Sequence, residues 1–241
     1  MSYIYGRNPV LEALRSNREV QKIYIAHGAH GSHIREIYKL AKRNRIPISN
    51  ASHKKIQQMV GDVIHQGVVA LISPVEIKSM DNLLHQLPNF PQPLTLVIAD
   101  RIQDPHNLGA IIRSSKALGA SGLVISLRDS TPITDTVIKA SAGAALKFPI
   151  FKAKNLAQAV DLLKENNVWI YGASLESEVV LWEMDFKRNC AIVVGSEGKG
   201  IRPIIQKKCD QLFHIPLSGQ VESLNASVAT GIILAEALRQ R

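Results

Sequence analysis

Apolar and polar residues alternate along the chain with two different periods, which predict short strands separated by amphipathic helices. In the first third, helices are predicted from residue 9 onward, with Asn8 as the cap, over residues 32–44, and through residue 59 with Ser52 as the cap. Strands are predicted over residues 20–26, 46–48 and 67–73. Residues 1–73 are therefore expected to form a small α/β domain.

Residues 74–93 have the pattern of a linker, with four prolines and one predicted helical turn over residues 80–86. After it, strands are predicted over residues 94–99, 122–126, 148–151, 168–172, 191–194 and 212–215. Helices are predicted over residues 107–118, 134–140, 156–165, 202–208 and 223–239. This alternation predicts a second α/β domain over residues 94–241, with a mostly parallel sheet covered on both faces.

Composition supports a globular protein, with 46% hydrophobic and 20% charged residues. There is no apolar run long enough for a bilayer and no signal-peptide core at the N-terminus, so we expect a cytoplasmic protein without a membrane partner. Two cysteines cannot form a disulfide scaffold and lack the spacing of zinc ligands.

Positive charge is concentrated in the first third of the chain. The net charge is +9, and residues 1–80 hold twelve basic and five acidic residues. This asymmetry indicates either a polyanion-binding N-terminal domain or simply a basic solvated surface. If the domain binds RNA, the candidate phosphate contacts are Arg7, Lys39, Lys42, Arg43, Lys54 and Lys55. The three histidines of residues 27–33 have no acidic or cysteine partner nearby, so an RNA-facing loop is favoured over a metal site.

Three polar segments each follow a predicted strand, where the ligand crevice of a parallel sheet lies. The first contains Asn107, for which a helix cap is the favoured interpretation, and Arg113, which could equally be a solvent-exposed cation. The second, residues 193–201, has three glycines in six residues but matches neither a Walker A loop nor a dinucleotide fingerprint. The third contains Ser223 and Asn225 before the last helix, where Ser223 could be only a cap.

The order of these segments resembles the SpoU/TrmH family of RNA ribose 2′-O-methyltransferases. The segments DPHNLGAIIR, VGSEGKGI and IPLSGQVESLNASVATGIILAEA are similar to its three motifs. YGRNPVLE and HQGVVA resemble the auxiliary domain of the subgroup that methylates guanosine in 23S rRNA, a domain similar to ribosomal protein L30e. The resemblance implies a trefoil-knotted SPOUT domain after an L30e-like RNA-binding domain, a homodimer, and S-adenosylmethionine as cofactor.

By this resemblance the catalytic residues are Arg113, Asn107, Glu197, Ser223 and Asn225, and the cofactor contacts are Gly195, Ile215 and Leu224. Methyl transfer from a sulfonium needs no metal. Because a guanidinium holds its proton tightly, Arg113 either loses it in a desolvated site or stays charged and positions a phosphate. The resemblance implies methylation of a guanosine in large-subunit rRNA. The alternatives are a tRNA methyltransferase of the same family and a non-catalytic RNA-binding protein.

Overall fold

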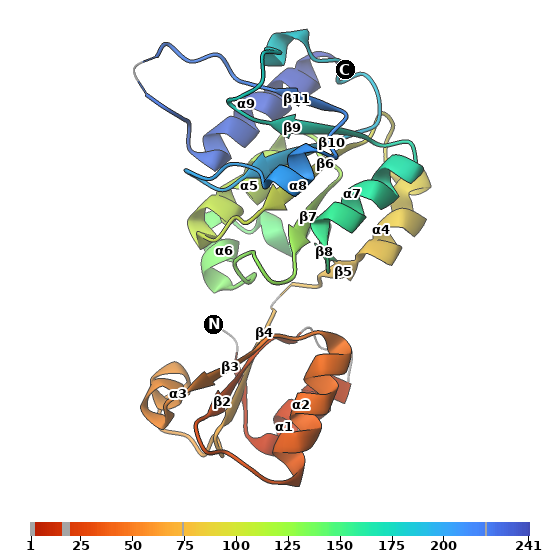
Figure 1. Cartoon of the computed structure of the whole chain (residues 1–241). Helices are drawn as coiled ribbons and strands as arrows, with labels where there is room; N and C mark the ends of the chain where they lie inside the picture. The colour runs from red at the N-terminus through yellow and green to blue at the C-terminus, as the bar shows by residue number, and fades with distance from the viewer. Residues whose placement is uncertain (1–2, 16–19, 74, 220) are drawn as a thin grey trace. The chain divides into compact units, whose positions relative to one another are not determined.

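The computed structural model describes residues 3–15, 20–73, 75–219 and 221–241 (Figure 1). Contacts divide the chain into two compact units, one of Met1–Glu76 with Pro132–Asp135 and the other of Ile77–Thr131 with Thr136–Arg241. Within the described residues, no helix has the length and apolar character needed to cross a membrane.

The N-terminal unit is built on a four-stranded sheet in the order β1 (Tyr3–Tyr5), β4 (Val68–Ile72), β2 (Val20–Ala26), β3 (Ile48–Ala51). Strands β2 and β3 are parallel, and β4 is antiparallel to both β1 and β2. Helices α1 (Arg7–Arg15) and α2 (Ser32–Asn44) bury their apolar sides in one core cluster with the sheet. Helix α3 (His53–Val60) buries Ile56 in a separate cluster, so it covers the other face of the sheet.

The structure corrects three expectations in this unit. Strand β1 was not predicted, because its three residues are too few to show a period. Strand β3 begins at Ile48, since the N–H of Ile46 donates to Ala41 O at 2.8 Å and so belongs to the end of α2. Helix α1 begins at Arg7 after Gly6, whose φ is +93°, so Asn8 lies inside the helix and does not cap it. The predicted cap Ser52 is confirmed, because its side chain accepts from Lys55 N at 3.2 Å.

The C-terminal unit is an α/β domain on a seven-stranded parallel sheet with the order β11-β9-β10-β6-β7-β8-β5. Its strands are β5 (Lys78–Ser79), β6 (Thr95–Asp100), β7 (Gly122–Ser126), β8 (Ile150–Ala153), β9 (Trp169–Ala173), β10 (Cys190–Gly195) and β11 (Gln211–Phe213). Its α-helices are α4 (Met80–Gln86), α5 (Pro105–Ala117), α6 (Asp135–Ala140), α7 (Leu156–Glu165), α8 (Pro203–Gln206) and α9 (Ala226–Arg239).

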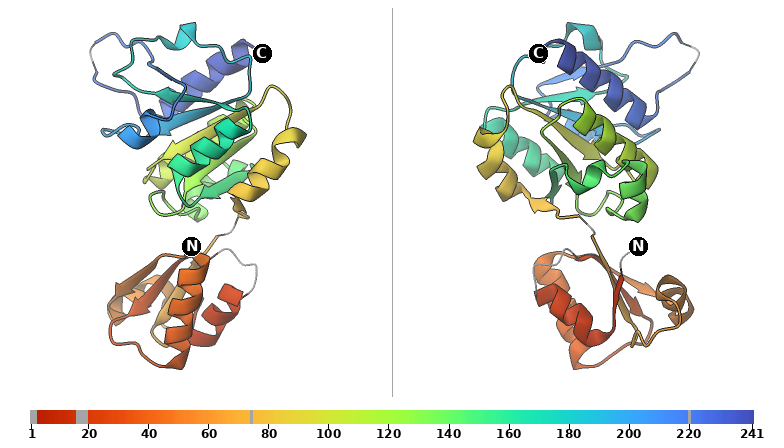
Figure 2. Two further views of the ribbon diagram at one scale, coloured as in Figure 1. Left: turned by 45° about the vertical axis from the view of Figure 1, so that its right-hand side comes forward. Right: turned by 180° about the vertical axis from the view of Figure 1, so that it is seen from behind.

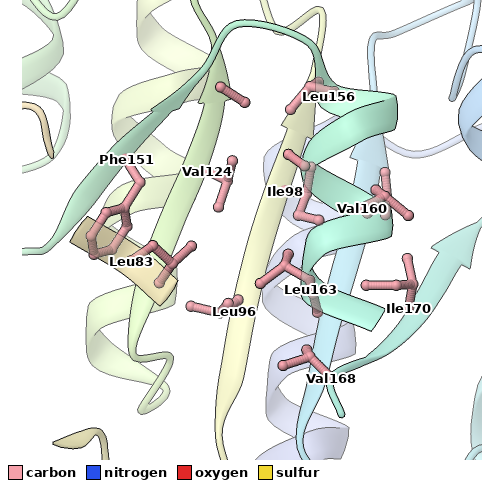
Figure 3. Close-up of a cluster of buried hydrophobic side chains, with 14 of the residues drawn as sticks. Leu83, Leu96, Ile98, Val124, Phe151, Leu156, Val160, Leu163, Val168 and Ile170 are labelled. Atoms are coloured by element: carbon pink, nitrogen blue, oxygen red, sulfur yellow. The ribbon is translucent and has the colours of Figure 1, made fainter. Parts of the chain in front are cut away.

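Helices cover both faces of this sheet, as Figure 2 shows, with α4 and α7 on one face and α5 and α9 on the other. Every residue of β6 and β7 is buried, as expected for parallel strands between two helical layers. On one face, Leu156, Val160 and Leu163 of α7 pack over the central strands in a single core cluster (Figure 3).

The segment predicted as a linker is largely part of the C-terminal unit. Ser79 caps α4 in a capping box with Asn82, and Leu83 and Leu87 are buried in the core of this unit. The sequence pattern showed only one helical turn between prolines, and so short a turn does not indicate which of its residues are buried. Pro74, the first residue of the predicted linker, lies outside the described residues.

Chain topology places the ligand crevice between β6 and β10. The chain leaves β6 through α5 to reach β7 on one side, whereas β10 pairs with β6 on the other. In parallel sheets, ligands bind at the carboxyl ends of strands where the order reverses in this way. Residues after Asp100 and Gly195, which are paired in register, therefore lie at the mouth of this crevice.

Candidate functional site

An ion pair joins the loops that leave β6 and β10. Asp100 is fully buried, and its Oδ1 accepts from Arg202 Nε and Nη2, each at 2.8 Å. Its Oδ2 accepts from the backbone N–H of Arg202 at 2.8 Å. These charge-assisted bonds hold the glycine-rich loop after β10 against the end of β6. Neither residue was predicted, and the only sequence signal was an aspartate ending an apolar strand.

Asn107 lies in the first turn of α5 and faces the loop after β10. Its Nδ2 donates to Glu197 Oε1 at 3.0 Å. The expectation that Asn107 caps this helix is wrong, because α5 begins at Pro105 and Asp104 accepts from His106 N at 2.9 Å. Asp104 and Pro105 begin the helix two residues before Asn107, and this earlier start leaves the Asn107 amide available to the site.

Asn225 brings the third segment to the same point. Its Nδ2 donates to Asn107 Oδ1 at 2.9 Å and also to Glu197 Oε1. Its Oδ1 accepts from Ser227 N at 2.9 Å, so Asn225 and not Ser223 caps α9. Asn107, Glu197 and Asn225 thus form a closed hydrogen-bonded triangle, defined here as the polar triangle, from three segments far apart in sequence.

A cavity of about 320 Å³ lies on one side of the polar triangle. Gly195, Ile215 and Leu224, the three predicted cofactor contacts, all line it, and so does Ser223. At Gly195 a side chain is excluded, because a Cβ would lie 2.0 Å from the carbonyl carbon of Gly200. The walls combine apolar side chains and glycine backbone with polar groups, among them Glu176 and Glu222, which is the usual construction of a small-molecule site.

A second cavity of about 350 Å³ lies beside the first, and both are lined by Ser196, Glu197, Lys199 and Ala226. Its remaining lining residues are polar or charged for the most part, and they include Arg101, Gln103, Asp104 and Asn107. Glu197 therefore lies where two neighbouring cavities meet. Its Oε1 is held by the two asparagines, and no described residue bonds its Oε2.

Arg113 is not brought to this point within one chain. It lies on α5, two turns beyond the start of the helix, and its side chain is exposed. Neither cavity is lined by Arg113, and among the described residues it has no hydrogen bond or ion pair.

Two family models cover nearly all of the chain. Residues 94–235 match the SpoU rRNA Methylase family, and residues 3–78 match the RNA 2′-O ribose methyltransferase substrate binding family. The chain belongs to the SpoU family. The fold expected from the sequence is confirmed, because SpoU methyltransferases of known structure share the parallel α/β domain and the N-terminal substrate-binding domain.

Two relatives support membership of the SpoU family. The chain is 38% identical over 239 residues to YacO of Bacillus subtilis, which is named as a TrmH family tRNA/rRNA methyltransferase. The match covers 99% of this chain and 96% of YacO. The chain is also 38% identical to the Synechocystis tRNA/rRNA methyltransferase slr0955, covering all of this chain and 63% of that protein. An AdoMet-bound rRNA methyltransferase from Sinorhizobium meliloti shares the fold, with a TM-score of 0.63, 24% identity, and coverage of 98% of this chain and 86% of that one.

The candidate RNA contacts in the N-terminal unit of this SpoU family member do not form one patch. Lys39, Lys42 and Arg43 are exposed on α2, whereas Lys54 and Lys55 are exposed on α3. Since α2 and α3 cover opposite faces of the sheet, a single RNA segment cannot lie flat against both groups. Arg7 lies at one end of the sheet, where it lines a cavity with several histidines, among them His53 at the start of α3.

Proposed function

We propose that the chain transfers a methyl group from S-adenosylmethionine to the ribose 2′-hydroxyl of a guanosine in large-subunit rRNA. The observation that carries the proposal is the polar triangle at the junction of two cavities. A transfer reaction needs the donor and the acceptor held next to each other in a fixed orientation, and two adjoining cavities allow this. The apolar cavity suits the cofactor, and the polar cavity suits the target nucleotide.

The residues around the first cavity fit S-adenosylmethionine. Its volume of about 320 Å³ lies within the usual range for small-ligand sites. Gly195 lets the loop after β10 close on itself beside the cavity, because a Cβ there would meet the backbone of Gly200, and Ile215 and Leu224 offer backbone groups beside apolar walls. When bound, the cofactor supplies a methyl group already activated on a sulfonium.

The polar triangle positions the acceptor. With Oε1 held by Asn107 and Asn225, the carboxylate of Glu197 keeps Oε2 available to accept a hydrogen bond from the ribose hydroxyl. Orienting a hydroxyl in this way raises the fraction of encounters in which it is aligned for attack. Ser223, at the rim of the first cavity, offers a further hydroxyl to the RNA or to the cofactor.

We also propose a homodimer, which gives Arg113 a place in the reaction. Helix α9 exposes half of Val228 and half of Leu238, apolar side chains that a second copy would cover. A second copy would also offer its own Arg113 to the polar cavity, where the guanidinium either removes the hydroxyl proton or holds a phosphate. The two roles predict different dependences of the methyl-transfer rate on pH. Measuring that rate across a pH series for Arg113→Lys would tell them apart.

Mixing two inactive variants tests this arrangement. Arg113→Ala and Glu197→Gln would each abolish transfer alone. If a site uses Arg113 of one copy and Glu197 of the other, random pairing restores roughly a quarter of the wild-type rate, because half of the dimers then hold one intact site. If each copy uses its own pair, mixing restores nothing.

The RNA substrate is tested by giving the protein labelled S-adenosylmethionine with unmodified large-subunit rRNA and, in parallel, tRNA. Nucleoside mass spectrometry then locates the methyl group. 2′-O-methylguanosine in rRNA alone supports the proposal. Methylation of tRNA alone would support the second candidate, which the names of the relatives leave open. Cofactor binding without transfer to either RNA would indicate a binding protein.

A further inference from the structure

A cavity of about 640 Å³ lies at one end of the N-terminal sheet. Four separate segments line it: the start of α1, the loop after β2, the start of α3 and the loop before β4. They contribute one arginine and four histidines, namely Arg7, His27, His30, His53 and His65. No acidic residue is among the described lining residues, so the cavity presents hydrogen-bonding imidazoles and the guanidinium of Arg7 to a ligand. We call it the histidine cavity.

Arg7 is fixed by the loop before β4. Its Nε donates to Gln66 O at 3.3 Å, and its backbone N–H donates to Gln66 Oε1 at 3.1 Å. Gln66 itself has a φ of +49°, a left-handed conformation that non-glycine residues rarely adopt. Gly31 leaves room for the guanidinium, because a Cβ there would lie 3.2 Å from Arg7 Nη1. Within the described chain no carboxylate pairs with Arg7, so its charge is available to an anion.

The imidazoles offer flat faces and ring N–H groups. The rings of His53 and His65 lie 5.7 Å apart and are tilted by 39°. His65 Nδ1 accepts from Gly67 N at 3.1 Å, which puts its ring proton on Nε2 when the imidazole is neutral. His30 Nδ1 lies 2.8 Å from Gly28 O, so this nitrogen donates. Among the described residues no set of side chains is arranged to hold a metal ion, so the rings are not explained as metal ligands.

We propose that the histidine cavity binds one unpaired nucleotide of the RNA substrate, with its base against the imidazole rings and its phosphate on the guanidinium of Arg7. This inference rests on the proposed function, since it takes RNA to be the substrate. Unpaired bases are recognised by stacking on aromatic side chains, and arginine binds phosphate in two-pronged geometry. A cavity can admit a base that has left its helix, whereas the lysines on α2 are arranged to meet the backbone of any RNA.

The test compares the double variant His30→Ala/His53→Ala with Lys39→Ala/Lys42→Ala. All four side chains are exposed, so neither pair is needed for the core of the unit. Binding is measured on the full chain by fluorescence anisotropy, with a labelled large-subunit rRNA fragment containing unpaired residues and with a perfectly paired RNA duplex. The histidine variant should bind the fragment about tenfold to a hundredfold more weakly and the duplex almost unchanged. The lysine variant should lose the same small factor, roughly threefold, on both.

The single variants His53→Phe and His53→Ala separate stacking from hydrogen bonding. Phenylalanine keeps an aromatic face, so His53→Phe should keep most of the affinity that His53→Ala loses. The inference is overturned if the histidine variant weakens both RNAs equally, or if it weakens the fragment less than the lysine variant does. S-adenosylmethionine affinity should be unchanged in every variant. Because binding is measured without methyl transfer, a wild-type chain that transfers no methyl group refutes the proposed function and leaves this test intact.

Discussion

The buried carboxylate of Asp100 gives the sharpest test of how the site is held together. We predict that Asp100→Asn destabilises the C-terminal unit far more than Asp161→Asn, a matched change in the same unit. Asp100 is fully buried with three donors from Arg202, whereas Asp161 pairs with Lys208 at 2.6 Å while its side chain is 45% exposed. Both carboxylate oxygens of Asp100 accept hydrogen bonds, so in Asp100→Asn the side-chain NH2 group must face a donor of Arg202 and leave it without an acceptor.

The expected magnitudes follow from burial. Breaking a buried pair by neutralising one partner costs about 3–5 kcal/mol, because the remaining charge loses its buried partner. Here Arg202 would keep only the carboxylate of Asp129, which is 44% exposed and lies 3.2 Å away. An exposed pair contributes about 0–1 kcal/mol. For a unit of this size each kcal/mol lowers Tm by about 2–4 °C, so Asp100→Asn should lower it by roughly 6–20 °C. Asp161→Asn should lower it by about 4 °C at most.

Tryptophan fluorescence during thermal unfolding measures this directly, since both tryptophans, Trp169 and Trp182, lie in the C-terminal unit. The reasoning would be refuted if the two variants lost equal stability. A second readout is the affinity for S-adenosylmethionine, which should fall at temperatures where the Asp100 variant is still folded, because the loop after β10 loses its attachment to β6.

Three further predictions follow from the same structure. Gly195→Ala should abolish cofactor binding in isothermal titration, because its Cβ would meet the backbone of Gly200 at 2.0 Å; unchanged affinity would show that the loop yields freely. Asn225→Ser should keep the cap of α9 and hence Tm within about 1 °C, but lose most methyl transfer, whereas Asn225→Ala should also lose about 1 kcal/mol of stability in denaturant titration. Glu236 has its pKa lowered to about 2, chiefly by hydrogen bonding from Arg239, so the carboxylate stabilises the fold above pH about 4.5 and loses that effect as pH falls to about 2. Glu236→Gln should therefore lower Tm at pH 7 and match the wild type near pH 2, and a constant difference across that range would contradict the assignment.

Sequence patterns correctly predicted the helices that bury one face and the strands that bury one or both faces. Strand 122–126, helix 32–44 and helix 156–165 have the predicted bounds, because apolar spacing reports burial directly. The two-residue strand β5 and the three-residue β1 were missed, since pairing with a neighbour defines them and no local period does. Residues 74–93 were predicted to be a linker because prolines are typical of exposed segments, whereas Leu83 and Leu87 are buried in the core of the C-terminal unit.

The residues of the candidate site were selected by their resemblance to family motifs, and the hydrogen bonds among them could not be predicted from the sequence pattern. Resemblance selected Asn107, Glu197 and Asn225, and the structure brings these three together, although nothing in their spacing, 90 and 28 residues apart, could predict a hydrogen bond. Asp100 and Arg202 were missed for the same reason, since a partner 102 residues away leaves no local pattern. Resemblance also selected Arg113, which the single chain leaves exposed and away from both cavities.

The two roles of Asn225 explain why the last helix begins where it does. Ser223 is also a residue type that caps helices well. If the helix began there, two residues earlier, the side chain of Asn225 would lie on the helix surface and not at its cap. Capping by Asn225 instead uses Oδ1 for the helix and leaves Nδ2 for Asn107 and Glu197. Only an amide can accept at the helix and donate to the carboxylate in this way, because a serine is too short and an aspartate has no donor. The start of α9 at Ala226 therefore places the Asn225 side chain where it serves both the helix and the polar triangle.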